Sequence, residues 1–119
     1  MQYLLMIYEA EEIWENKSDD EKRAEMEKHD LLHEALDRDG VEWSGQPLMA
    51  TTTAVSVRSR AGQVTVSDGP FAETKEALAG FYLIDVDSLE HATHFAAMIP
   101  SVQTGTIEVR PIADHSGLT

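Results

Sequence analysis

Apolar and polar positions alternate along the chain in a way that predicts five strands and two helices. The first strand pattern is an almost continuous apolar run at 2–8, typical of a central strand buried on both faces. Ala61-Gly62 separates two shorter alternating stretches and predicts the turn of an antiparallel hairpin. The segments with a strand pattern are 2–8, 51–58, 63–66, 78–86 and 106–112.

The first helix is expected over 19–39. Ser18 and Glu21 have the spacing of a capping box, in which each side chain bonds the other residue's backbone N–H. Gly40 follows as a natural helix stop, since glycine adopts the left-handed conformation without strain. Small and apolar residues suggest one buried face, and they are Ala24, Met26, Leu32, Ala35 and Leu36.

The second helix opens at 87–90 and ends before Pro100. Apolar residues recur in it at three- and four-residue spacing, namely Leu89, Ala92, Phe95, Ala96 and Ile99. Between the two helices, 41–43 predicts a short extended piece, and 44–47 predicts a turn because it contains Ser, Gly and Pro.

This order of elements predicts an α+β fold with two helices on one face of an antiparallel sheet. Two helices cannot cover both faces, although the runs at 2–8 and 78–86 suggest strands buried on both sides. Packing the uncovered face against a second copy would resolve the conflict, so we expect a homodimer.

Composition narrows the class of protein. The 119 residues include 22 acidic and 9 basic side chains and no cysteine, and the net charge is −13. This length suits one core, so we expect a single domain over 1–112 and a short polar tail over 113–119. The negative charge argues against nucleic-acid and anionic-membrane partners, and no apolar run approaches the ~20 residues that span a bilayer. The absence of cysteine favours a cytoplasmic location.

Most of the negative charge lies in the first third of the chain. Residues 1–42 contain 14 acidic and 5 basic side chains, a balance of −9. The simpler interpretation is a solvated helix face. The alternative is an acidic docking face for a basic partner.

The stretch SDGPFAETKE at 67–76, followed by GFYLI at 80–84, closely resembles the signature of DGPF-domain proteins, a branch of the YCII-related family. YLLMIY at 3–8, the acidic helix entry at Ser18 and GTIEVRPI at 105–112 also match. The resemblance extends over nearly all of 1–112.

The resemblance implies a ferredoxin-like fold that dimerises into an α/β barrel with a polar cleft beside it. Relatives in the wider YCII group include a dehydrochlorinase of a chlorinated hydroxyquinone, in which an Asp and a His are implicated. DGPF-type proteins are also associated with alternative sigma factors of the extracytoplasmic-function kind. The resemblance therefore implies a fold more definitely than a reaction.

Asp68 is the first candidate for catalysis. It ends a predicted strand and precedes Gly69-Pro70, where a loop can present a functional group from a rigid scaffold. If it is half-buried beside Phe71, which we expect to fill the core, it could act as a general base. The alternative is structural, because Asp before Gly commonly caps its own turn.

His29 and His33 are four residues apart, so both imidazoles project from one face of the first helix. One of them could act as a general acid or base with Asp68. The same spacing suits a metal site, but a third ligand is missing, and we expect neither metal nor cofactor. The alternative is that both are ordinary surface or interface histidines.

Lys75, Tyr8 and Arg110 are the candidates for substrate binding. Lys75 could hold a carboxylate or enolate in an otherwise acidic cleft, or simply belong to a solvated charge cluster. Arg110 on the last strand needs a partner, and Glu108 lies on the same strand face; an interface ion pair is favoured over substrate binding.

Two functions remain open. The first is a dimeric enzyme that performs acid/base chemistry on a small organic molecule in a cleft near Asp68. The second is a non-catalytic module that binds a small ligand or a sigma-factor-type partner. Neither a nucleophilic serine motif nor a phosphate-binding glycine loop is present.

Overall fold

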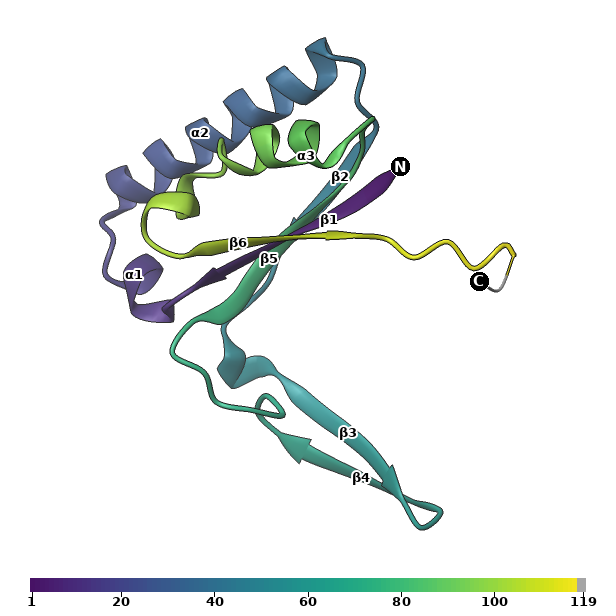
Figure 1. The fold of residues 1–119 in the computed structure, drawn as a ribbon. Coiled ribbons are helices and arrows are strands. Elements are labelled where there is room, and N and C mark those ends of the chain that lie inside the picture. Colours follow the sequence, from purple (N-terminus) through teal and green to yellow (C-terminus); the bar gives the residue numbers. More distant parts are fainter. Residues whose placement is uncertain (118–119) are drawn as a thin grey trace.

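The computed structural model describes residues 1–117, and its centre is a four-stranded antiparallel sheet with all its helices on one side (Figure 1). The strand order is β2-β5-β1-β6. The strands are β1 (Gln2–Glu9), β2 (Trp43–Pro47), β5 (Ala77–Asp85) and β6 (Thr106–Pro111). The helices are α1 (Glu11–Glu15), α2 (Asp19–Arg38) and α3 (Leu89–Ala96), with 3₁₀ turns η1 (Thr51–Thr53) and η2 (Pro100–Gln103). The predicted α+β class is confirmed.

Helix α2 begins as predicted. The Ser18 hydroxyl accepts from the Glu21 backbone N–H, and the Glu21 carboxylate accepts from the Ser18 N–H, both at 3.1 Å. The expected buried face is correct only in its second half. Leu32 is buried on the sheet, whereas Met26 is 54% exposed. At 100° per residue the buried stripe runs back from Leu32 through His29, which leaves Met26 on the flank.

The predicted hairpin is present as β3 (Val55–Arg60) and β4 (Gln63–Asp68). Ala61 and Gly62 have φ of 50° and 78°, as a two-residue turn of the twisted hairpin requires. These strands form a separate two-stranded sheet that projects from the rest of the molecule (Figure 1). We call residues 54–69 the arm and the remaining described residues the body.

The fourth strand of the main sheet is β2, where the sequence predicted a turn at 44–47, and that prediction is wrong. Gly45 allows a close approach of the chains, since a Cβ there would lie 2.8 Å from the Phe81 carbonyl oxygen. Pro47 is tolerated because it lies at the end of an edge strand. The residues that suggested a turn therefore serve close pairing at a sheet edge.

The core lies between the helices and the inner face of the sheet. Its largest fully buried side chains are Leu5, Leu32, Leu36, Ile84, Phe95 and Ile99. Leu89 is exposed, so the predicted stripe of α3 is correct except at its first residue. Phe71, expected to fill this core, is 80% exposed in the loop after the arm.

The opposite, outer face of the sheet is covered by no helix among residues 1–117 (Figure 1). It carries Leu4 and Met6 of β1 directly across from Leu83 and Phe81 of β5. These four side chains are half-buried, while their sequence neighbours on the inner face are buried. Within one chain, the central strands are therefore buried on one face only.

Among residues 1–117, none of the helices combines the length and the apolar character that a transmembrane segment requires.

Candidate functional site

Two histidines of α2 converge on one tyrosine of β5. The Nδ1 atom of His29 lies 2.7 Å from the Tyr82 hydroxyl oxygen, and Nε2 of His33 lies 2.8 Å from the same oxygen. The four-residue spacing aims both imidazoles from the helix toward the sheet, and Tyr82 points from the inner face toward α2. We call His29, His33 and Tyr82 the His–Tyr–His cluster.

An aromatic ring and a carboxylate lie beside His33. Trp43 of β2 stacks on its imidazole with ring centroids 4.3 Å apart, and the indole N–H donates to Asp37 at 2.8 Å. The outward-facing Nδ1 of His33 lies 4.0 Å from an oxygen of Asp30. The His33 side chain keeps 33% of its exposure, so solvent can reach this edge of the cluster.

Partial burial favours the neutral forms of His29 and Tyr82. Burial lowers the pKa of His29, and the neighbouring Glu25 opposes this shift only in part. Burial, assisted by the nearby Asp30 charge, raises the pKa of Tyr82 to about 12. At neutral pH the phenol therefore keeps its proton, and His29 can accept it in a hydrogen bond.

Which nitrogen of His33 is free depends on which imidazole accepts the phenol proton. The phenol has one proton, so it can donate to only one of the two imidazoles. If Tyr82 donates to His29, its oxygen accepts from the Nε2–H of His33. The neutral His33 then has its lone pair on Nδ1, the nitrogen that faces Asp30 and solvent.

Asp68 lies far from this cluster in the fold. It is the last residue of β4 in the arm, on the side of the sheet opposite α2 (Figure 1). The adjacent turn is held through Gly69, whose N–H donates to the Ala54 carbonyl at 2.7 Å and whose carbonyl accepts from the Ser56 hydroxyl at 2.8 Å. The single chain thus brings His29 and His33 together but does not bring Asp68 to them.

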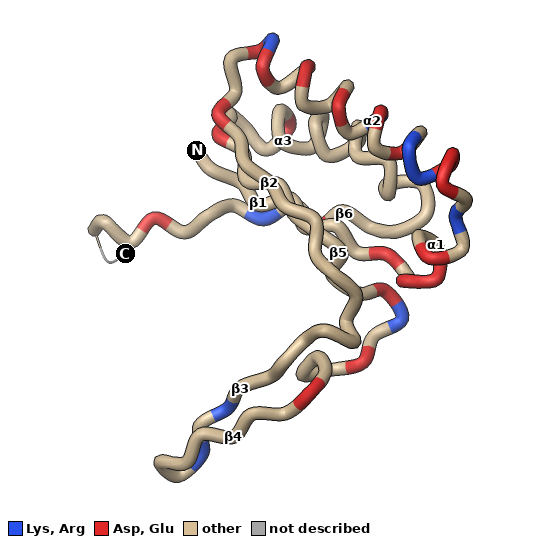
Figure 2. The backbone as a smooth tube through the Cα atoms, turned by 180° about the vertical axis from the view of Figure 1, so that it is seen from behind, with Lys and Arg blue, Asp and Glu red and all other residues tan. Residues whose placement is uncertain are grey.

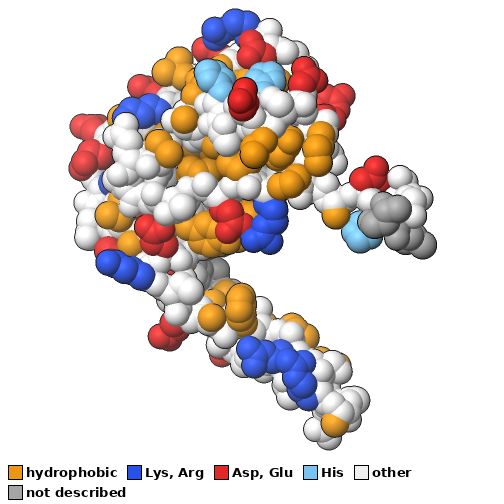
Figure 3. Space-filling view, in the orientation of Figure 1, with side chains coloured by type: hydrophobic (Ala, Val, Ile, Leu, Met, Phe, Trp, Pro, Cys, Tyr) orange, Lys and Arg blue, Asp and Glu red, His pale blue; other side chains and the backbone are white. Residues whose placement is uncertain are grey.

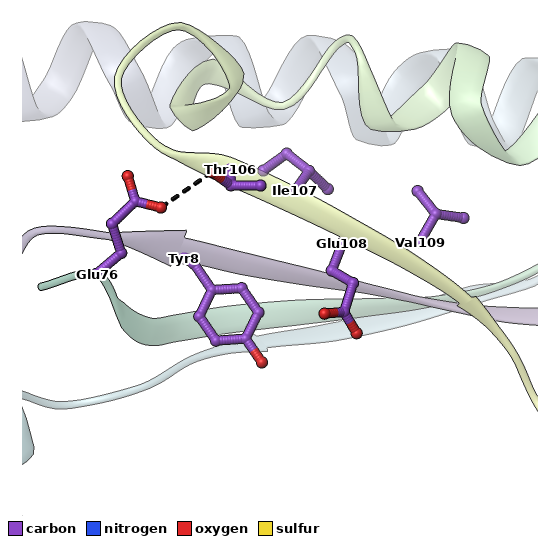
Figure 4. Close-up of a pocket in the computed structure, with 6 residues that line it drawn as sticks. All are labelled: Tyr8, Glu76, Thr106, Ile107, Glu108 and Val109. Carbon is purple, nitrogen blue, oxygen red and sulfur yellow. Dashed lines mark hydrogen bonds between the residues drawn. The ribbon is translucent and has the colours of Figure 1, made fainter. Parts of the chain in front are cut away.

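Tyr8 and Arg110 lie on the outer face of the sheet, and Lys75 is exposed in the loop before β5. Arg110 forms an ion pair with Glu108 of the same strand, and its place at an interface stays a prediction. A shallow depression of about 580 Å³ lies beside Tyr8, and Figure 4 shows its side chains. It is lined by Tyr8, Glu76, Thr106, Ile107, Glu108 and Val109.

The metal alternative has no further ligand in the part of the chain described. Among residues 1–117, no three His, Cys, Asp or Glu side chains group together as they would to hold a metal ion. The negative charge lies where it was predicted, along α2 and the segment before it (Figure 2).

The chain belongs to the YCII-related family, since the model of the YCII-related domain matches residues 1–116. The resemblance of the sequence to that family is therefore confirmed. An uncharacterized protein, R00369 of Rhizobium meliloti (strain 1021), is similar to this chain, with 53% identity over 68 residues. The match covers 56% of this chain, and the chain spans about half the length of that relative (55%).

Sequence reasoning found the histidines but missed Tyr82 and Trp43 as their partners. The alternation of 78–86 places Tyr82 on the same face as Ile84 and identifies it as a core residue. A polar group on a predicted inner face is the one signal that could have indicated it, because a buried phenol needs a hydrogen-bond partner.

Proposed function

We propose that this YCII-related protein transfers protons to or from a small organic molecule and that His33 is its catalytic base. The observation that supports this most strongly is the pair of imidazoles on one phenol oxygen. Tyr82 and His29 act as positioning residues that keep the lone pair of His33 on Nδ1. Asp30 stabilises the imidazolium that forms when Nδ1 takes a proton.

Proton transfer can be tested before a substrate is identified. The purified protein is incubated in D₂O with a panel of small carbonyl and phenolic compounds, and exchange of their acidic C–H groups is followed by NMR. We expect catalysed exchange with some members of the panel, a loss of roughly 100-fold in His33→Gln and of roughly 10-fold or more in Tyr82→Phe. Tyr3→Phe, at a core tyrosine outside the cluster, serves as the control.

The position of the base can be tested separately by ¹⁵N NMR of the histidine rings. The proposal requires His33 to be protonated at Nε2 when neutral, and Tyr82→Phe to remove this preference. Exchange activity that survives in His33→Gln, or a His33 ring protonated at Nδ1, would contradict the proposed role.

We also propose that two copies pack their outer sheet faces together into an α/β barrel. The strand order β2-β5-β1-β6 supports the ferredoxin-like assignment that the resemblance implied. The apolar outer face of Leu4, Met6, Phe81 and Leu83 supports pairing, because covering it removes apolar area from water. Light scattering should give twice the chain mass of 13.2 kDa, and a mass of one chain would overturn this proposal.

The cleft expected near Asp68 stays a prediction that needs the second chain. Within one chain Asp68 and the histidines lie on opposite sides of the sheet (Figure 1). If a partner's Asp68 completes the site, Asp68→Asn should lower the exchange activity by about the same factor as His33→Gln. An unchanged activity would contradict a catalytic role for Asp68.

The alternative function is a regulatory module that binds a basic, sigma-factor-type partner. The specific observation in its favour is the row of exposed carboxylates along the outward side of α2 (Figure 2). Replacing Glu27 and Glu34 by Gln should weaken such a complex and leave proton exchange unchanged. His33→Gln should leave such a complex unchanged and lower proton exchange.

A further inference from the structure

The two faces of the arm differ in polarity. The strand register places Val57 across from Val66, and Val55 and Val64 lie on the same face beside them. All four valines are exposed, by 56–68%. Ser59 and Asp68 lie at the two ends of this face, across from Val64 and Val55. The other face carries Arg58 across from Thr65 and Arg60 across from Gln63. We call the face of Val55, Val57, Val64 and Val66 the valine face.

A two-stranded hairpin is not expected to leave an apolar face of this kind uncovered in solution. Two-stranded hairpins alone are marginal in water and need an apolar partner surface for stability. Contiguous exposed apolar side chains of this kind mark an interaction site. Phe71, just after the arm, is also exposed.

The position of the arm limits what can cover it. The arm leaves the sheet between β2 and β5 and extends on the side opposite the helices, the side of the outer face (Figure 1). Figure 3 shows an open angle between the underside of the body and the arm, with hydrophobic side chains along the margin of the arm that is turned toward the body. Anything packed on the outer face therefore lies within reach of the arm.

The net charges of the arm and of the rest of the chain have opposite signs. The arm contains two basic residues, Arg58 and Arg60, and one acidic residue, Asp68, so its net charge is +1. Because the whole chain has a net charge of −13, the other residues carry −14. Both arginines lie on the face opposite the valines, so packing of the valine face leaves these charges unburied.

We infer that the arm clasps a second copy of this chain and packs its valine face on the partner's body. This inference rests on the proposed dimer and goes beyond it: the arms, and not the sheet faces alone, hold the two copies together. By symmetry each dimer has two such contacts, one from each arm.

The experiment compares two neighbouring substitutions on opposite faces of β4. Val66→Asp places a carboxylate on the valine face, and Thr65→Asp adds the same charge to the other face. Dimer dissociation is measured by sedimentation over a range of protein concentration. We expect Val66→Asp to weaken the dimer at least about 100-fold, because the new charge would be buried without a partner. We expect Thr65→Asp to change it less than about threefold.

A third variant, Phe81→Asp, disrupts the outer sheet face and separates the two proposals. If Val66→Asp dimerises like wild type while Phe81→Asp is monomeric, the arm plays no part and the sheet-face dimer stands. If the wild-type protein is itself monomeric, the proposed dimer fails and the clasp fails with it. Hydrogen exchange gives a second readout: amides of the arm should exchange more slowly as wild-type dimer forms, and should not do so in Val66→Asp.

Discussion

The body and the arm contain the same kind of strand and bury it to different extents. In β1 every second side chain is covered by helices, so that Leu5 is 1% exposed. In β3 the valines at 55 and 57 also alternate with polar side chains, yet Val57 is 63% exposed. Both strands have the alternation that predicts one apolar face. The difference shows that the alternation of apolar and polar residues indicates which face of a strand needs covering. It does not indicate which part of the molecule covers that face.

The largest contrast is expected from core truncation. Phe95→Ala in the body should lower the free energy of unfolding by about 3–5 kcal/mol, because the ring is fully buried between α3 and the sheet. Val57→Ala in the arm should change it by less than about 0.5 kcal/mol in the monomer. Urea unfolding at low protein concentration measures both, and equal losses would show that the arm belongs to the cooperative core.

Within the body, removing the Tyr82 hydroxyl tests the cluster as a structural element. Tyr82→Phe leaves both ring nitrogens of the half-buried histidines without their partner, so it should cost about 1–2 kcal/mol. Tyr3→Phe is the matched control at another buried tyrosine of the same sheet. A Tyr82→Phe protein as stable as the control would mean that the cluster is not formed in solution.

The cap of α2 gives a smaller effect. Ser18→Ala removes the side-chain acceptor for the Glu21 N–H and should cost about 1 kcal/mol. Ser59→Ala, at an exposed serine of the arm, should have an effect within about 0.5 kcal/mol. Thermal unfolding followed by circular dichroism at 222 nm measures both.

Acid should destabilise the body gradually and in a defined direction. Because burial places the folded-state pKa of His29 below its ordinary value of 6.5, the unfolded chain binds more protons once the pH falls below 6.5. Stability should therefore decrease from pH 6.5 downward, and His29→Gln should flatten this part of the curve. The arm contains no histidine, so its contribution to dimerisation should not follow the titration of His29.

High pH acts on the same cluster through the phenol. The pKa of Tyr82 is raised to about 12 from 10.0, so the unfolded state loses this proton first as pH rises. The stabilisation is complete below pH 10 and is lost between pH 10 and 12. Tyr82→Phe should remove this loss when the free energy of unfolding is measured as a function of pH. If the variant loses stability between pH 10 and 12 as the wild type does, the assignment to Tyr82 is wrong.

Local signals predicted most of the fold. The capping box at Ser18, the turn at Ala61-Gly62 and the apolar stripe of α3 each depend on a few neighbouring residues, and all three are present. The edge strand β2 was missed because the role of Gly45 depends on Phe81, which is distant in the sequence. The candidate site was half predicted for the same reason: helical spacing pairs His29 with His33, whereas Tyr82 joins them only through the fold.

The sequence by itself determined the α+β class, the family and the place of the negative charge, since all three depend on residue types and short spacings. The tertiary structure alone decided that the hairpin leaves the sheet as an arm, that Phe71 is exposed and that a phenol bridges two imidazoles. These features arise where segments distant in sequence meet, or fail to meet. The hydrophobic pattern limits such contacts without choosing among them.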